Sequence, residues 1–314
     1  MKNLFSKIFS KSTKDIDEQM PVPATKEPPT LPVTAENVNK KTTPTPMVRS
    51  EEIFPQYVVG CAQSTGQQRN HNEDSLFTFT SNLSNHGNLL AFGLYIVADG
   101  MGGHKHGEIA SGLAVKTLAE HVLNQVFNPI LQHQGSAPEE SIQEILQTGV
   151  QMAHQTIIKN AKGGGTTLTA ALMIDEQVTI AHIGDSRCYS ISQDRVLNLI
   201  TRDHSLVMRM IELGQLSPEE ASVHPQRNVL YRALGQGEPL TADIQTHSLP
   251  LGGLILICSD GLWGVVPEQN ILDIIFAAPD LQQACEQLIS AANQAGGPDN
   301  ITAILIRVPD EFNR

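Results

Sequence analysis

The chain has 314 residues, of which 40% are hydrophobic and 17% charged, and its formal net charge is −12. This length and composition exclude a wholly disordered or fibrous protein and predict a folded core of one large domain or two small ones. The acidic balance opposes binding to phosphate-rich chains, so we expect no nucleic-acid role. No apolar run reaches the roughly 18–20 residues of a membrane-spanning helix, and we see no secretory signal at the N-terminus.

Four cysteines are spread over the chain without CxxC spacing: Cys61, Cys188, Cys258 and Cys285. Isolated cysteines of this kind are typical of reduced core residues rather than of a disulfide framework or a zinc site. We therefore expect a cytoplasmic protein.

The first 50 residues differ in composition from the rest. They carry eight basic and five acidic residues and seven of the 18 prolines, whereas the remainder has 13 basic and 28 acidic residues. Such a segment cannot bury enough apolar surface to fold alone. We predict a disordered tail rich in Pro, Thr and Lys over 1–50 and one folded domain over 51–314.

Residues 1–14 contain an amphipathic pattern inside this tail. Leu4, Phe5, Ile8 and Phe9 fall on one helical face, and lysines surround them. The pattern is typical of a helix that contacts a membrane surface or a partner. A solvated basic tail is the interpretation that we favour, and membrane contact through residues 1–14 is the alternative.

The predicted elements alternate between clusters of strands and pairs of helices. Apolar and β-branched runs predict strands at 57–62, 75–80, the run ending at 98, 166–175, 178–183, 188–192, 196–200, 243–248, 254–259 and 301–308. Helical spacing and start signals predict helices at 108–126, 138–159, 205–213, from 217 onward, 267–277 and 281–295, with breaks at Pro129 and Gly135. We expect the four strands between 166 and 200 to form one antiparallel meander. This order indicates a layered α+β fold rather than a parallel doubly wound one.

Carboxylates stand at the ends of several predicted buried strands: Glu73-Asp74, Asp99, Asp185, Asp260 and Asp299. A carboxylate at the end of a buried strand is costly unless it is paired or binds a metal. If the strands share one sandwich, these groups can converge at one end. A set of oxygen ligands without His or Cys pairs favours Mg²⁺ or Mn²⁺ over zinc. Each acid taken singly is equally well interpreted as an ordinary turn residue.

Arg69 lies four residues before Glu73. A guanidinium beside an acidic metal cluster suits bidentate binding of a phosphate. Taken alone, Arg69 would be interpreted as a surface arginine.

Eight motifs occur in an order that resembles one family. They are RNHNEDS, ADGMGGH, GGGTT, HIGDSR, TRDHS, HPQRNVLYRALG, CSDGLW and GGPDNIT, and the resemblance covers about Tyr57 to Val308. Together they resemble the metal-dependent, type-2C serine/threonine protein phosphatases, with the best match to the bacterial members. The resemblance implies a four-layer αββα sandwich, in which helix pairs flank two antiparallel sheets.

The resemblance also implies a binuclear Mn²⁺ or Mg²⁺ centre. In it Asp99 would bridge the two ions, and the other ligands would be the Gly100 carbonyl, Asp260 and Asp299. Asp185, together with Asp260, would hold a possible third ion. A hydroxide bridging the two metals would attack phosphorus directly. Glu73 and Asp74 would orient metal-bound waters, and Arg69 would bind the substrate phosphate.

The segment Ser205–Gly237 resembles the family's flap, a cover beside the site that influences substrate choice. Arg209, Arg227 and Arg232 would contact phosphopeptides there, or would form salt bridges within the flap. The implied substrates are phosphoserine and phosphothreonine proteins, and the implied counterpart is an opposing Ser/Thr kinase. The alternatives are a catalytically silent interaction module with the same fold and a phosphatase dedicated to a single partner-switch protein.

Overall fold

The computed structural model describes residues 56–312 apart from 86–87, 103–104, 133–139 and 238–239. The predicted tail over 1–50, with its segment 1–14, lies outside the described residues. Within the described part, no helix is both long enough and apolar enough to cross a bilayer.

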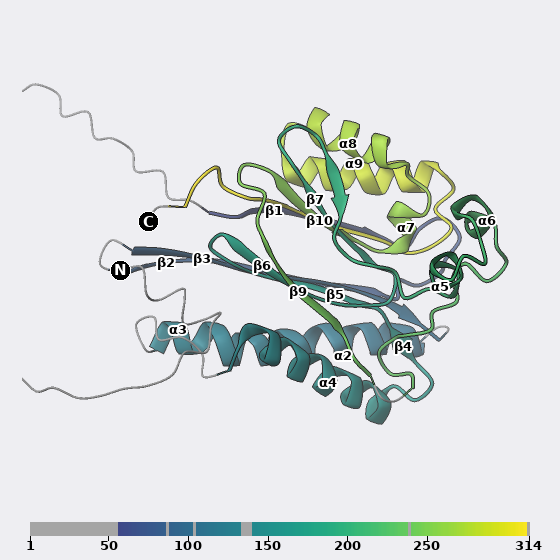
Figure 1. Cartoon of the computed structure of the whole chain (residues 1–314), viewed down its shortest axis with the longest axis horizontal. Coiled ribbons are helices and arrows are strands. Elements are labelled where there is room, and N and C mark those ends of the chain that lie inside the picture. Colours follow the sequence, from purple (N-terminus) through teal and green to yellow (C-terminus); the bar gives the residue numbers. More distant parts are fainter. Residues whose placement is uncertain (1–55, 86–87, 103–104, 133–139, 238–239, 313–314) are drawn as a thin grey trace, which may run out of the picture. The chain divides into compact units, whose positions relative to one another are not determined.

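The described strands form two antiparallel sheets (Figure 1). One sheet has the order β1 (Val58–Ser64), β11 (Ile301–Arg307), β10 (Leu254–Cys258), β7 (Arg187–Ile191) and β8 (Leu197–Leu199). The other has the order β2 (Asp74–Asn85), β3 (Asn88–Met101), β5 (Leu168–Ile174), β6 (Gln177–Ile183) and β9 (Asp243–Ser248), with the short β4 (Gly165–Thr166) paired to β3.

Helices cover the outer face of each sheet, as Figure 1 shows. The sheet built on β3 is covered by α2 (Lys105–Val122), α3 (Asn128–Gln132) and α4 (Ile142–Asn160), and the sheet built on β11 by α7 (Asp260–Trp263), α8 (Glu268–Ala277) and α9 (Leu281–Gln294). Two further short helices, α5 (Leu206–Glu212) and α6 (Pro218–Ser222), lie in the segment predicted to be the flap. The predicted α+β class and the αββα layering are confirmed.

Strand alternation distributes the apolar residues between the layers. In β11, Ile301, Ala303 and Leu305 pack against the helices, whereas Ile304 and Ile306 pack between the two sheets. This period of two is what a strand buried on both faces requires. It also directs the Thr302 side chain into the layer between the sheets, at the end of β11 where the acids lie.

Two expectations about local structure were wrong. Pro129 does not end the helical region, because a π-helical turn at Leu123–Phe127 absorbs the change and Pro129 then falls in the first turn of α3. The π-helical turn interrupts the regular i→i−4 hydrogen-bond ladder just before Pro129, which has no N–H to continue that ladder. The strands between 166 and 200 do not form one meander: β5 and β6 pair in one sheet, and β7 and β8 pair in the other. The crossing follows Gly184, whose φ of +106° is a conformation that glycine adopts without strain.

Candidate metal centre

The predicted acids come from both sheets and meet at one end of the sandwich. Asp74 and Asp99 are directly opposite each other in the paired strands β2 and β3. Asp260 follows β10 as the first residue of α7, Asp299 lies two residues before β11, and Asp185 follows β6. Burial raises the pKa of the Asp99 carboxyl well above its usual range, and the nearby charges of Asp74, Asp260, Asp185 and Asp299 raise it further. The structure therefore brings all five aspartates within electrostatic reach of one another.

The backbone at Asp99 is held by two threonines. Thr167 Oγ1 accepts a hydrogen bond from the Asp99 amide, and the Thr167 amide donates to the Asp99 carbonyl, both at 2.9 Å. Thr166 Oγ1 donates to the same carbonyl at 2.9 Å. These contacts fix the backbone of β3 at Asp99, near the end of the strand.

Gly100 is a position that no larger residue can occupy. A Cβ placed there would meet the Gly107 carbonyl and would lie 2.6 Å from the Glu73 carbonyl oxygen. The Gly100 amide donates to that Glu73 carbonyl at 3.1 Å, so the two loops are in backbone contact. The predicted Gly100 and Glu73 thus belong to the same cluster as Asp99.

Asp74 is buried and held by hydroxyls from the other sheet. Its Oδ2 accepts hydrogen bonds from Ser259 Oγ at 2.8 Å and from Thr302 Oγ1 at 2.6 Å. Burial raises the Asp74 pKa to about 7 against the lowering effect of these two hydrogen bonds. Its Oδ1 is buried without a hydrogen-bond partner.

Asp260 has a similar environment. Burial is the largest cause that raises the Asp260 pKa to about 6, and the charge of Asp299 is the second. The Asp260 Oδ1 is also buried without a hydrogen-bond partner. Burial raises the pKa of Asp185 well above its usual range, with the Asp260 charge as the next cause. Asp185 and Asp260 are therefore neighbours, as their predicted common role requires.

Arg69 lies on the rim of this cluster. Its Nη2 forms an ion pair with Asp299 Oδ2 at 2.7 Å, and half of its side chain is exposed. The other Asp299 oxygen accepts the Asn300 amide at 2.8 Å. An exposed guanidinium next to the acids is accessible to a ligand from solvent.

The carboxylate oxygens of this cluster are the kind of ligand that hard divalent cations such as Mg²⁺ and Mn²⁺ prefer. In the described part of the chain, no three His, Cys, Asp or Glu side chains are grouped as a ready metal site, and Asp299 is engaged by Arg69 instead. Two observations support the fit: the carboxylates raise each other's pKa, and Asp74 and Asp260 each bury one oxygen that has no hydrogen-bond partner. Buried oxygens without partners are costly; a cation would satisfy the Asp260 oxygen, and a water bound to that cation would satisfy the Asp74 oxygen.

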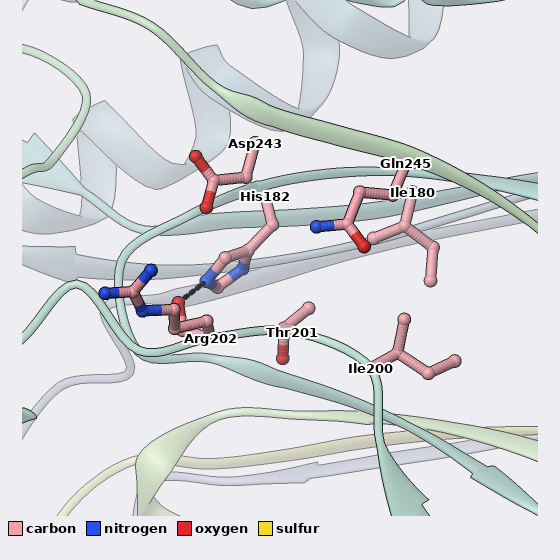
Figure 2. Close-up of a pocket in the computed structure, with 7 residues that line it drawn as sticks. All are labelled: Ile180, His182, Ile200, Thr201, Arg202, Asp243 and Gln245. Atoms are coloured by element: carbon pink, nitrogen blue, oxygen red, sulfur yellow. Dashed lines mark hydrogen bonds between the residues drawn. The ribbon is translucent and has the colours of Figure 1, made fainter. Parts of the chain in front are cut away.

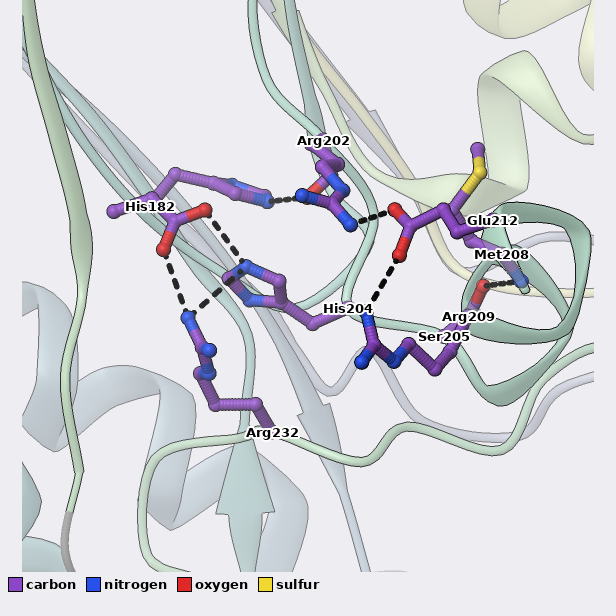
Figure 3. Close-up of polar contacts among 9 residues, drawn as sticks. His182, Arg202, His204, Ser205, Met208, Arg209, Glu212 and Arg232 are labelled. Carbon is purple, nitrogen blue, oxygen red and sulfur yellow. Dashed lines mark hydrogen bonds and ion pairs between the residues drawn. The ribbon is translucent and has the colours of Figure 1, made fainter.

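The flap arginines are largely engaged in ion pairs (Figure 3). Arg209 Nη1 contacts Glu212 Oε2 at 3.1 Å within the flap, and Arg202 pairs with the same carboxylate. Arg232 Nη1 contacts Asp243 Oδ1 at 2.8 Å and thereby joins the flap to β9. Arg227 lies in the turn after α6, where its amide donates to the His224 carbonyl. For Arg209 and Arg232 the structure thus contains the salt bridges that the sequence left as an alternative to peptide contact.

A small cavity lies beside the flap and is separate from the acids. It is lined by Ile180, His182, Ile200, Thr201, Arg202, Asp243 and Gln245 (Figure 2). Its volume of about 10 Å³ is no more than one water molecule needs. None of the predicted metal ligands lines it, so this cavity is not the reaction site.

Sequence reasoning did not identify the polar residues that support the acids. Ser259 and Thr302 hold Asp74, and Asn300 holds the loop that carries Arg69. Ser259 and Asn300 are each adjacent to a predicted acid, and Thr302 lies three residues after Asp299. No local signal identifies their contacts, because each of these side chains supports a group more than 180 residues away.

Comparison with known proteins assigns the family. Residues 63–305 match the family model described as Protein phosphatase 2C. The chain is 37% identical over 241 residues to the serine/threonine phosphatase stp of Listeria monocytogenes. This alignment covers 77% of the chain and 92% of the relative.

Two solved structures with 30% sequence identity share the fold. The Mycobacterium tuberculosis serine/threonine phosphatase PstP/Ppp superposes with a TM-score of 0.68 over 81% of this chain and 99% of that one. The catalytic domain of PstP in complex with two manganese ions gives a TM-score of 0.65 with the same coverage. The chain therefore belongs to the protein phosphatase 2C family, the metal-dependent serine/threonine phosphatases.

Proposed function

We propose that the chain hydrolyses phosphoserine and phosphothreonine esters in proteins at the aspartate cluster, with Mn²⁺ or Mg²⁺ as cofactor. Asp99, the Gly100 carbonyl, Asp260 and Asp299 would hold two ions, and Asp185 with Asp260 would hold a third. The observation that carries the proposal is the set of mutually repelling carboxylates with buried, unpartnered oxygens at Asp74 and Asp260. The crystallised complex of the relative PstP with two manganese ions supports the choice of cofactor.

The cations, when bound, supply a low-pKa water as nucleophile and neutralise charge on the phosphate, which permits direct attack on phosphorus. The protein's own contribution is to hold its ligands rigidly. Thr166 and Thr167 hold the backbone at Asp99, and the Ser259 and Thr302 hydroxyls fix one oxygen of Asp74, leaving the other to accept from water. Glu73, whose backbone is hydrogen-bonded to Gly100, would serve the same water-orienting role.

Arg69 would bind the phosphoryl oxygens of the substrate. Its planar fork matches two of these oxygens, and its exposed position beside Asp299 leaves it accessible to a phosphoprotein. Charge on the phosphate would compete with Asp299 for the guanidinium. Arg227 remains our candidate for contact with the peptide, because Arg209 and Arg232 have acidic partners.

The biological setting follows from this chemistry. A phosphatase acting on phosphoserine and phosphothreonine implies a kinase that forms those esters, so we place the chain opposite a Ser/Thr kinase. A cytoplasmic location is supported by the four cysteines, all of which are free.

The first experiment measures hydrolysis of p-nitrophenyl phosphate and of a phosphothreonine peptide by the full-length protein with Mn²⁺, with Mg²⁺ and with EDTA. We expect activity with either cation, none with EDTA, and a loss of at least about 100-fold in Asp99→Asn because a buried ligand is removed. Asp194→Asn, at an exposed turn between β7 and β8, is the matched control and should be fully active. Activity that survives EDTA or Asp99→Asn would contradict the proposal.

A further inference from the structure

Arg187, the first residue of β7, connects groups from three parts of the fold. Its Nε and Nη2 donate to the two oxygens of Asp203 at 3.1 and 2.8 Å, and its Nη1 donates to the Tyr189 hydroxyl at 3.1 Å. Its guanidinium carbon lies 3.5 Å from the centre of the Trp263 ring. Only 17% of the Arg187 side chain and 5% of that of Asp203 are exposed. A bidentate ion pair combined with stacking on an indole requires the planar fork of arginine, which lysine lacks.

Trp263 connects this arginine to two of the predicted metal ligands. It is the last residue of α7, the single helical turn that begins at Asp260. Its indole Nε1 donates to the Asp185 carbonyl at 3.0 Å. The tryptophan therefore joins the turn that carries Asp260 to the turn that carries Asp185.

Asp203 connects the same arginine to the root of the flap. The next residue, His204, donates its amide to the Gly184 carbonyl at 2.7 Å, and its Nδ1 accepts the Gly184 amide at 3.1 Å. Because Nδ1 accepts, the ring proton is on Nε2, which donates to Asp243 Oδ2 at 3.1 Å. Ser205 then caps α5 by accepting the Met208 amide, as Figure 3 shows.

We propose that Arg187 is a positioning residue that holds Asp185 in register with Asp260 and with the root of the flap, so that binding of a divalent cation at Asp185 alters the surroundings of Trp263. This inference rests on the proposed function, because it assigns Asp185 and Asp260 a shared cation. The contacts form a closed circuit from Asp185 through Trp263, Arg187 and Asp203 to His204 and Gly184. Loss of the arginine fork removes the contacts of Arg187 with Asp203 and Trp263, so the turn that carries Asp185 can shift relative to Asp260.

Trp263 provides a readout that does not depend on catalysis, because it is the only tryptophan of the chain. The full-length protein is titrated with Mg²⁺ while tryptophan emission is recorded. We expect a saturable change in wild type and a midpoint at least about tenfold higher in Arg187→Lys, since contacts that orient a metal ligand typically contribute a factor of 10–100 in affinity. Arg195→Lys is the matched control, because Arg195 also lies over an aromatic ring, that of Phe276 at 4.7 Å, on a turn far along β7 from Asp185. Its midpoint should equal that of wild type.

A second measurement separates positioning from a general loss of stability. In Arg187→Lys, kcat for p-nitrophenyl phosphate should fall at limiting Mg²⁺ and recover at excess Mg²⁺, whereas a merely structural role would lower kcat at all concentrations. Tyr189→Phe removes one hydrogen bond from the guanidinium and should shift the emission midpoint in the same direction by less. If Arg187→Lys fails to fold, the emission midpoint of Tyr189→Phe is the test of the proposal.

Two results would overturn the inference while leaving the proposed function intact. One is a wild-type midpoint in the folded Arg187 or Tyr189 variant. The other is a wild-type protein whose tryptophan emission does not change on addition of Mg²⁺ although its hydrolysis of p-nitrophenyl phosphate requires Mg²⁺. Failure of the proposed function is recognised separately, since wild type would then lack cation-dependent hydrolysis before any Arg187 variant is made.

Discussion

Asn300 uses its entire side-chain amide to hold the loop that carries Arg69. Its Oδ1 accepts the Glu73 amide, and its Nδ2 donates to the carbonyls of Thr65 and His71, each at 2.8 Å. The residue is 4% exposed, so water does not replace these contacts. Only a side chain that accepts once and donates twice satisfies all three groups, which explains an asparagine at this position.

Asn300→Asp should therefore destabilise the protein. The change removes the hydrogen bonds to the Thr65 and His71 carbonyls, at a cost of about 1 kcal/mol each, and adds a negative charge beside Asp299. Urea unfolding measures the effect, and KM for p-nitrophenyl phosphate should rise as the Arg69 loop loosens. Asn198→Asp, on the exposed face of the edge strand β8, is the control. Equal urea midpoints for Asn300→Asp and wild type would contradict this account.

The acids of the site could be predicted from the sequence, whereas their supports could not. Asp99 and Asp260 are conspicuous because a charged residue directly follows an apolar run. Ser259 and Thr302 carry no such signal, since a hydroxyl is common at a strand end and its partner, Asp74, is more than 180 residues distant. The ion pair of Arg232 with Asp243 likewise depends on how the flap packs on β9, whereas Arg209 and Glu212 are only three residues apart on α5.

The turn between β5 and β6 illustrates how an element tolerates a partly buried acid. Asp175 has a φ of +46°, and its Oδ1 accepts the Ala91 amide at 2.9 Å. Burial raises its pKa from the usual 3.8 to about 6, although the Ala91 hydrogen bond lowers it. Folding therefore favours the protonated form of Asp175 relative to the unfolded chain, although the carboxyl is still mostly ionised at neutral pH.

Asp175→Asn should stabilise the protein above about pH 6. The raised pKa means that the contribution of Asp175 to stability is complete below about pH 4 and is lost as pH rises through about 6. Asparagine keeps an acceptor for Ala91, tolerates a positive φ and carries no charge. The difference in urea midpoint between variant and wild type should grow from pH 4 to pH 7, and Asp194→Asn should show no such trend. A difference independent of pH would contradict the assignment.

Element boundaries were predictable where local signals are strong. Ser217 caps α6 with a capping box to Glu220, and the start-signal prediction at that serine is confirmed. The switch of sheets after β6 was missed because alternation within β6 and β7 is the same whichever sheet each joins. That choice depends on Gly184 and on the packing of the two sheets.

At the scale of the whole molecule, the aspartate cluster is a source of instability that cations should relieve. The charges of Asp74 and Asp260 oppose ionisation of the buried Asp99, the charge of Asp299 opposes ionisation of Asp260, and both sheets must close around these acids. A ligand that binds only the folded state stabilises it by about 2.7 kcal/mol at a concentration 100 times its Kd.

Mg²⁺ should therefore raise the Tm of wild type, and EDTA should reverse the effect. Without cations, Asp99→Asn should have a higher Tm than wild type because it removes a buried like charge, and its Tm should respond weakly to Mg²⁺. NaCl at equal ionic strength controls for screening. A cation-free Asp99→Asn that melts below wild type would contradict this view of the cluster.

The pairing of β1 with β11 has a practical consequence for labelling. Val58 is opposite Arg307 at one end of the two strands, whereas Ser64 is opposite Ile301 beside Asp299 at the other. Seven residues of strand span roughly 20 Å. A fluorophore or affinity tag attached at the exposed Gln56 would therefore lie at the opposite end of the strands from the carboxylates, where it would not obstruct a docking phosphoprotein.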